Sequence, residues 1–465
     1  MSTRAVATGE TTARPRPWFF DVDAIASCAP LVVLIVIGTW RKGGFFKPDV
    51  VALPCLCLAL AFVSPVVLSW LRRHPLPVLA GVAVTAWWVV DAQIWRHSVE
   101  SWRLAAAWLC AAAGYGVARS LPLTARRMAA LAVTVIGFAL SIAGLVVVAA
   151  SSTLWTWTDE RSLRFQGPLT YPSAIGLYLL ITLIASIEVW RLGTATGGRP
   201  PAGQALARPG AGEPALWAGL ATPVRAFIVL GVVATDSRGA LLGLVVLLCF
   251  RSVRCELGQA IVAAVIASPA LLFGQRDGVR PWLIVVAAVV ALAVASVPRH
   301  LVRNAIRYLA IPALVVAGWL LATQHHAVSG FDASWTERGH ILRGATKVFT
   351  AHPIFGAGPD PFIPTTTLNG QPGIDAFAHN EFLELLISIG VVGVVVLAVG
   401  GYLAVRPLWA RRGALAAPVL ATAVAGGLVD FVWHFPALGL LCGAVAGLSA
   451  PLITAARERV AFGGD

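Results

Sequence analysis

Long apolar runs recur along the whole chain and restrict its fold more than any other feature. A helix needs about 20 consecutive apolar residues to cross the hydrocarbon core of a bilayer, and most of these runs have about that length. They lie at roughly 24–40, 50–71, 76–94, 101–118, 128–150, 172–190, 215–234, 239–250, 257–273, 281–297, 305–322, 381–404, 414–432 and 435–454. The sequence therefore predicts an all-α polytopic integral membrane protein with about 12–14 transmembrane helices. The lower number applies if the short eighth run and the ninth form a re-entrant pair.

The composition excludes the main soluble classes. Hydrophobic residues make up 58% of the 465 residues and charged residues only 12%, whereas soluble domains have about 25% charged residues. The net charge of +13 comes mostly from arginines in the segments between apolar runs, which is the distribution of a membrane protein and not of a nucleic-acid binder. The seven cysteines lie mostly within apolar runs, show no zinc spacing and are expected to be buried small hydrophobes. A soluble enzyme, a disordered chain and a disulfide scaffold are excluded as well.

Basic residues are more frequent in the segments that share a side with the N-terminus. Because cytoplasmic loops carry an excess of Lys and Arg, we expect a multi-pass protein of the cytoplasmic (cell) membrane with both termini in the cytoplasm. The expected parts are a cytoplasmic tail, an N-terminal membrane bundle with a cytoplasmic linker, a large extracytoplasmic loop, C-terminal membrane helices and a second cytoplasmic tail, at 1–23, 24–322 (linker 191–214), 323–380, 381–454 and 455–465. Long polar loops of this kind are usually functional, and helical patterns are expected around 338–350 and 381–389.

Three polar blocks interrupt the apolar pattern on the side predicted to face outward. They are RFQGPLTYPS (164–173), TDSRGALL (235–242), and a third region that starts at Arg338, passes through HPIFGAGP (352–359) and ends in HNEFLELLISIGVVG (379–393). Polar residues gathered on one side of a membrane bundle are typical of a binding or catalytic site. The chemistry of the protein is therefore expected in these blocks.

His379 and Asn380 stand at the start of a strongly apolar helix. Asn380 is a suitable N-cap, and Glu381 and Glu384 suit the first turn, where the helix dipole favours negative charge. A histidine has an ordinary pKa of about 6.5, so it accepts protons readily near neutral pH. His379 is therefore either a general base or an incidental neighbour of a capped helix.

Arg238 lies between two apolar runs, beside Asp236 and Gly239. An arginine in such a place is costly unless it is paired or hydrated. Its guanidinium presents a rigid fork of donors that suits phosphate groups, so one interpretation is an anion clamp. The alternative is a structural pair with Asp236, or an end residue that reaches to the membrane interface.

Other residues near the outer face have two interpretations each. Asp430 and His434 are four residues apart, so they either pair with each other on one helix face or face a substrate. Trp155, Trp157 and Trp335 either stack on sugars or belong to the aromatic belt of the interface. The sequence has no GxxxxGK[ST] motif, no HExxH and no outer carboxylate cluster with ligand spacing, so we expect no metal and no other cofactor.

Together the blocks resemble the O-antigen ligase and polymerase superfamily of bacterial membrane glycosyltransferases. The matches are a Ser-Arg-Gly-like turn at SRG (237–239), an arginine (Arg338) before Pro-x-x-Gly-x-Gly at PIFGAG (353–358), and His379-Asn380 before Gly-x-x-Gly at 390–393. The resemblance covers roughly 160–400. It departs from the family pattern at Leu342, where a Trp is common, and at Ser173, where an Asn often follows the first turn. Gly390 and Gly393 are expected to share one helix face and to allow a close neighbour.

The resemblance implies a metal-independent transferase that moves a glycan from a polyprenyl diphosphate, such as undecaprenyl diphosphate, to an acceptor hydroxyl on the outer face of the membrane. The acceptor is a glycan, a lipid, the cell wall or a protein, so the enzyme is a ligase or a polysaccharide polymerase of the cell envelope. The implied catalytic residues are His379, Arg238 and Arg338, and the implied substrate-binding residues are Arg164, Asn380 and Trp335. The other class that we considered is a transporter or flippase of a similar amphiphile. Transporters often show inverted repeats and broken helices, and the sequence shows neither.

Overall fold

The computed structural model describes twelve segments of the chain, namely 21–46, 49–63, 102–159, 162–195, 215–275, 280–297, 339–358, 363–366, 372–375, 377–409, 415–430 and 432–450. Several predictions lie outside these residues. They concern the apolar runs at 76–94 and 305–322, the residues Trp335 and Arg338, and most of the predicted outer loop, cytoplasmic linker and terminal tails.

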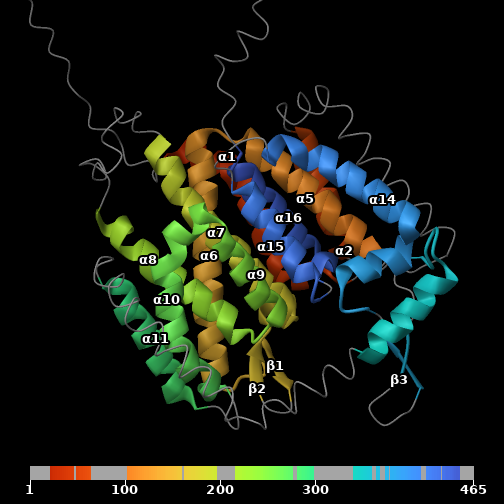
Figure 1. Cartoon of the computed structure of the whole chain (residues 1–465). Coiled ribbons are helices and arrows are strands. Elements are labelled where there is room, and N and C mark those ends of the chain that lie inside the picture. Colours follow the sequence, from red (N-terminus) through yellow and green to blue (C-terminus); the bar gives the residue numbers. More distant parts are fainter. Residues whose placement is uncertain are drawn as a thin grey trace, which may run out of the picture.

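Every predicted apolar run that falls within the described residues forms a helix. The helices are α1 (Val22–Trp40), α2 (Asp49–Val63), α5 (Arg103–Ser120), α6 (Leu123–Ala149), α7 (Pro172–Ala195), α8 (Ala215–Ala234), α9 (Arg238–Cys249), α10 (Arg251–Gly274), α11 (Pro281–Ser296), α14 (Glu381–Trp409), α15 (Ala416–Gly427) and α16 (Pro436–Leu448) (Figure 1). In the described part of the chain, five helices or parts of helices are long and apolar enough to cross a membrane, from α1, α6, α7, α10 and α14. The predicted class, an all-α polytopic membrane protein, is confirmed.

Two short antiparallel hairpins in the described part of the chain were not predicted. β1 (Thr156–Asp159) pairs with β2 (Ser162–Phe165), and β3 (Ile363–Thr366) pairs with β4 (Pro372–Asp375). The described residues also include three short 3-10 helices, η2 (Lys42–Gly44), η4 (Gly167–Leu169) and η5 (Val432–His434). The predicted helical stretch in the outer loop is present at 339–351 (teal in Figure 1).

α7 occupies the centre of the bundle. Its residues from Pro172 to Glu188 are all buried, and it contacts α6, α8, α9, α15 and α16. A helix that is apolar on every side is stable where neighbours cover each face. Because α7 is enclosed in this way, the residues at its start have a fixed position relative to the helices around it.

Helix α16 packs closely on α5 through small residues. Its glycines recur every fourth position, and a Cβ added to Gly439, Gly443 or Gly447 would collide with backbone oxygens of α5. Small residues at this spacing let two membrane helices approach until their backbones touch. This contact fixes α16, and with it the loop before α16, against the start of α5.

Helix α14 is broken at Gly390, which has φ 65° and ψ −175°. The break leaves backbone groups of α14 without partners in their own helix, and the segment 353–358 supplies them. The amides of Ala357 and Gly358 donate to carbonyls on one side of the break, and the amides of Val391 and Val392 donate to the carbonyls of 353 and 354. The prediction that Gly390 and Gly393 share one helix face is therefore wrong, because the helix is interrupted at Gly390. Gly390 instead receives a neighbouring backbone.

We expect Gly390→Ala to lower the melting temperature of the purified protein clearly. An alanine at Gly390 would hold an unfavourable left-handed conformation, which costs about 1–3 kcal/mol, and its Cβ would collide with the carbonyl oxygen of Ile354. Thermal unfolding in detergent measures the effect. Gly258→Ala in α10 is the matched control, because a Cβ there meets nothing within 4 Å and alanine favours a helix. Equal melting temperatures for the two variants would show that the break tolerates a side chain.

Candidate active site

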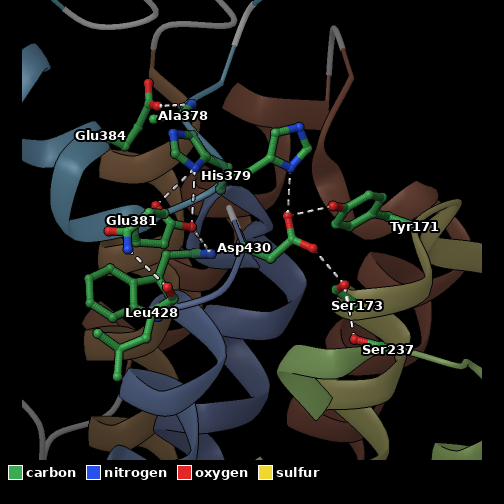
Figure 2. Close-up of polar contacts among 12 residues, drawn as sticks. Tyr171, Ser173, Ser237, Ala378, His379, Glu381, Glu384, Leu428 and Asp430 are labelled. Atoms are coloured by element: carbon green, nitrogen blue, oxygen red, sulfur yellow. Dashed lines mark hydrogen bonds and ion pairs between the residues drawn. The ribbon is translucent and has the colours of Figure 1, made fainter. Parts of the chain in front are cut away.

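The three polar blocks of the sequence meet at one end of the bundle. Block one contributes the start of α7, block two contributes the turn before α9, and the third block contributes the start of α14. A fourth segment, the loop between α15 and η5, lies among them and carries Asp430 (Figure 2). The polar side chains of these four segments form one hydrogen-bonded cluster.

His379 lies against the carboxylate of Asp430. Its Nδ1 is 3.1 Å from Oδ1 of Asp430, and the two side chains are 28% and 5% exposed. The backbone of His379 is left-handed, with φ 52°, a conformation in which histidine is more common than most residues. An imidazole held by a carboxylate at Nδ1 is oriented, and its Nε2 is then the nitrogen that accepts a proton.

Asp430 lies after the end of α15 and receives two further hydrogen bonds. The hydroxyl of Tyr171 donates to Oδ1 at 2.5 Å, and that of Ser173 donates to Oδ2 at 2.7 Å. Burial by itself would raise the pKa of Asp430, but the hydrogen bond and charge of His379, together with the hydroxyls of Tyr171 and Ser173, outweigh it and hold the pKa below the ordinary value. Asp430 is therefore a carboxylate at neutral pH.

The turn before α9 reaches the same cluster. Ser237 is the N-cap of α9, and its Oγ accepts from the amide of Ala240 and lies 3.0 Å from Oγ of Ser173. The next residue, Arg238, is exposed and begins the helix. Asp236 has a left-handed backbone, and its Oδ2 lies 3.5 Å from Nε of Arg164. Arg238 thus follows Ser237 in this turn, and Arg164 contacts the same turn through Asp236.

Asn380 has the predicted role of an N-cap. Its Oδ1 accepts from the amides of Phe382 and Leu383. Its Nδ2 also donates to the carbonyl oxygen of Leu428 at 2.9 Å. The turn at 379–380 is therefore bound to the loop that carries Asp430 by two neighbouring side chains, through Asn380 and through His379 itself.

The predicted pair between Asp430 and His434 is wrong. Asp430 binds His379, whereas Nδ1 of His434 lies 3.3 Å from Oε2 of Glu381. The prediction relied on helical spacing, but α15 ends at Gly427, before Asp430, and His434 is the last residue of η5. Positions four apart face each other only in a helix, so the spacing carried no information here.

The two acidic residues in the first turn of α14 both point into the protein. Glu381 is completely buried, and besides His434 it accepts from the amide of Trp433. Glu384 accepts from the amide of Ala378 at 2.8 Å. Glu384 thus fixes the residue before His379, and Glu381 joins the start of α14 to η5, in addition to matching the helix dipole.

The remaining predicted site residues have varied placements. Trp155 packs edge-on against Trp40, with ring centroids 5.5 Å apart, and Trp157 is 52% exposed on β1. Arg338 and Trp335 lie outside the described residues. Within the described segments, no group of three His, Cys, Asp or Glu side chains has the arrangement of a metal site.

His379, Arg238, Arg164 and Asn380 were predicted from the sequence, but the contact between His379 and Asp430 was not. The two residues are 51 positions apart, so no local pattern joins them. The available signal was the cost of a charged residue within an apolar run. The contact of the Tyr171 hydroxyl with Asp430 was not predicted either, although Tyr171 lies within the first polar block.

The comparison with protein families agrees with the resemblance seen in the sequence. A family model described as O-antigen ligase matches residues 224–398, a range that contains Arg238, His379 and the break in α14. The search of curated proteins found no match. Residues 224–398 of this chain are thus similar to the O-antigen ligase family, in agreement with the superfamily that the motifs predicted.

Proposed function

We propose that the protein is an inverting, metal-independent glycosyltransferase that moves a glycan from a polyprenyl diphosphate to an acceptor hydroxyl on the outer face of the cytoplasmic membrane. The similarity to this family supports a membrane glycosyltransferase of the O-antigen ligase or polymerase type. The single observation that carries the finer proposal is the link between a carboxylate-bound histidine, His379, and the turn that presents Arg238. Both the ligase and the polymerase role use this chemistry, with different acceptors.

In this proposal His379 is the general base. Its Nδ1 is held by Asp430 at 3.1 Å, so Nε2 takes the proton from the acceptor hydroxyl as the hydroxyl oxygen bonds to the anomeric carbon. The neighbouring carboxylate stabilises the imidazolium that results. A positioned base of this type contributes about 10²–10⁴-fold in rate.

The leaving diphosphate takes the electron pair of the breaking carbon–oxygen bond. Negative charge develops there, so the site needs fixed positive charge. Arg238 begins α9, and a helix N-terminus also favours an anion. We assign the diphosphate to Arg238, with Arg164 and Arg338 as further cations. Attack from the face opposite the diphosphate inverts the anomeric carbon.

The test is transfer by the purified protein from a synthetic polyprenyl-diphosphate glycan, with EDTA present. We expect transfer without a divalent metal or a nucleotide. Arg238→Lys should lose most turnover, because lysine keeps the charge but lacks the fork that holds two phosphate oxygens. Arg251→Lys is the matched control, since Arg251 is exposed and begins α10 as Arg238 begins α9.

Three outcomes would count against parts of this proposal. Loss of transfer in EDTA with recovery on adding a divalent ion would refute the metal-independent mechanism. Near wild-type turnover of Arg238→Lys would favour a structural role for this arginine. Translocation of the lipid across vesicles without glycan transfer would identify a transporter instead.

A further inference from the structure

Two buried serines connect the turn before α9 to the carboxylate that holds His379. Oγ of Ser237 lies 3.0 Å from Oγ of Ser173, which lies 2.7 Å from Oδ2 of Asp430 (Figure 2). Ser237, Ser173 and Asp430 are 4%, 9% and 3% exposed. The three residues come from different elements, so the contacts join the starts of α9 and α7 to the loop after α15.

The direction of the hydrogen bonds in this series follows from the number of protons that each group can donate. A serine hydroxyl has one proton to donate, and an ionised carboxylate only accepts. Ser173 therefore donates to Asp430, and Ser237 must donate to Ser173. Oγ of Ser237 in turn accepts from the amide of Ala240 in the first turn of α9. All the bonds point from the positive end of α9 toward Asp430, so each one strengthens the next.

This series of hydrogen bonds also joins the two parts of the proposed chemistry. Ser237 directly precedes Arg238, the residue assigned to the leaving diphosphate. Asp430 holds His379, the residue assigned to the acceptor proton. Neither serine is exposed enough to touch a substrate, because both hydroxyls are occupied inside the protein. Any effect of the serines on the reaction must therefore pass through the groups that they hold.

We propose that Ser173 and Ser237 are positioning residues, whose hydroxyls form a relay that fixes the diphosphate-binding turn relative to the Asp430–His379 pair. The relay has two consequences. It supplies a hydrogen bond that orients the Asp430 carboxylate, and it holds the turn that carries Arg238 in a fixed position relative to His379. This inference rests on the proposed function and adds residues that act on the rate of the chemical step without contacting substrate.

The experiment compares Ser173→Ala, Ser237→Ala and the double variant with the wild type, in the full-length protein with the synthetic donor. We expect kcat of Ser173→Ala to fall by roughly 10-fold or more, since a hydrogen bond to a charged group is lost, while KM for the donor changes little. Ser237→Ala should have a smaller effect, because Ser173 still donates to Asp430. In the Ser173→Ala background, Ser237→Ala should add almost nothing to the loss of kcat, since the relay is already cut.

Two further variants separate positioning from general stability. Ser173→Thr keeps the hydroxyl and should recover most of kcat. Ser141→Ala is the matched control, because Ser141 is completely buried and donates to the carbonyl of Gly137 in its own helix; its kcat should equal that of the wild type. If Ser173→Ala does not give folded protein, Ser173→Cys replaces it as a weak donor of similar size.

The outcomes distinguish this inference from the function on which it rests. An active wild type with kcat of Ser173→Ala within about twofold would overturn the relay alone. Effects of the two serines that multiply in the double variant would show that they act independently, which also contradicts it. A wild type that transfers no glycan would remove the proposed function, and the relay with it.

Discussion

His379→Ala should transfer glycan at least about 100-fold more slowly than the wild type, because the reaction loses the proposed general base. The variant should still fold, since the Asn380 cap and the buried Glu381–His434 pair hold the start of α14 without the imidazole. Single-turnover transfer with saturating donor measures the chemical step. Binding of the lipid donor, measured separately, should remain.

A glutamine at position 379 separates a base from a residue that only orients the loop. Glutamine keeps a hydrogen bond to Asp430 but accepts no proton at neutral pH. His379→Gln should therefore be as slow as His379→Ala. His352→Ala is the control, because His352 is exposed beyond the end of the helix 339–351 and its loss should leave the rate near that of the wild type. Substantial transfer by the glutamine variant would remove His379 from the chemistry.

Asp430→Asn should lower kcat on the order of 100-fold, although the side chain keeps its size. The amide can present N–H groups toward Nδ1 of His379, which moves the ring proton to Nε2 and removes the lone pair that the reaction needs. It also removes the negative charge that stabilises the imidazolium. Because the pKa of Asp430 lies below its ordinary value, the wild-type carboxylate is ionised throughout the range of about pH 6–8, so the deficit should be similar across that range.

Asp49→Asn provides the control for this substitution. Asp49 forms an ion pair with the exposed Arg41 at 2.9 Å, and surface pairs of this type contribute about 0–1 kcal/mol. Its loss should leave transfer unchanged. If Asp430→Asn also kept more than about a tenth of the wild-type kcat, the carboxylate would be structural and His379 would need another partner as a base.

The sequence predicted much of this architecture because the helices are long and apolar. Runs of that length leave few alternatives in a bilayer, and the cap at Asn380 follows from local chemistry that a short segment contains. The three polar blocks were recognised for the same reason, as exceptions to an apolar pattern. The sequence predicted that the three blocks lie on the same side of the membrane, but it did not predict that they contact one another.

The features that were not predicted depend on contacts between distant segments. The break at Gly390 exists because the backbone at 353–358 pairs with it, and a glycine within a helical pattern does not reveal such a partner. The wrong pairing of Asp430 with His434 came from applying helical spacing after Gly427, where the chain leaves α15. The partner of His379 is defined by tertiary packing, through α7 and the close contact of α5 with α16.

The loop after α15 carries the residue of the polar cluster that is synthesised last. Tyr171 and Ser173 emerge from the ribosome first, Ser237 and His379 follow, and Asp430 comes last of the group. A nascent protein that has inserted α14 already carries the histidine, but the carboxylate that orients it has not yet been translated. Under the proposed function, an unfinished or truncated product in the membrane is therefore held inactive, and the pool of lipid-linked glycan is not consumed by partly made copies of the protein.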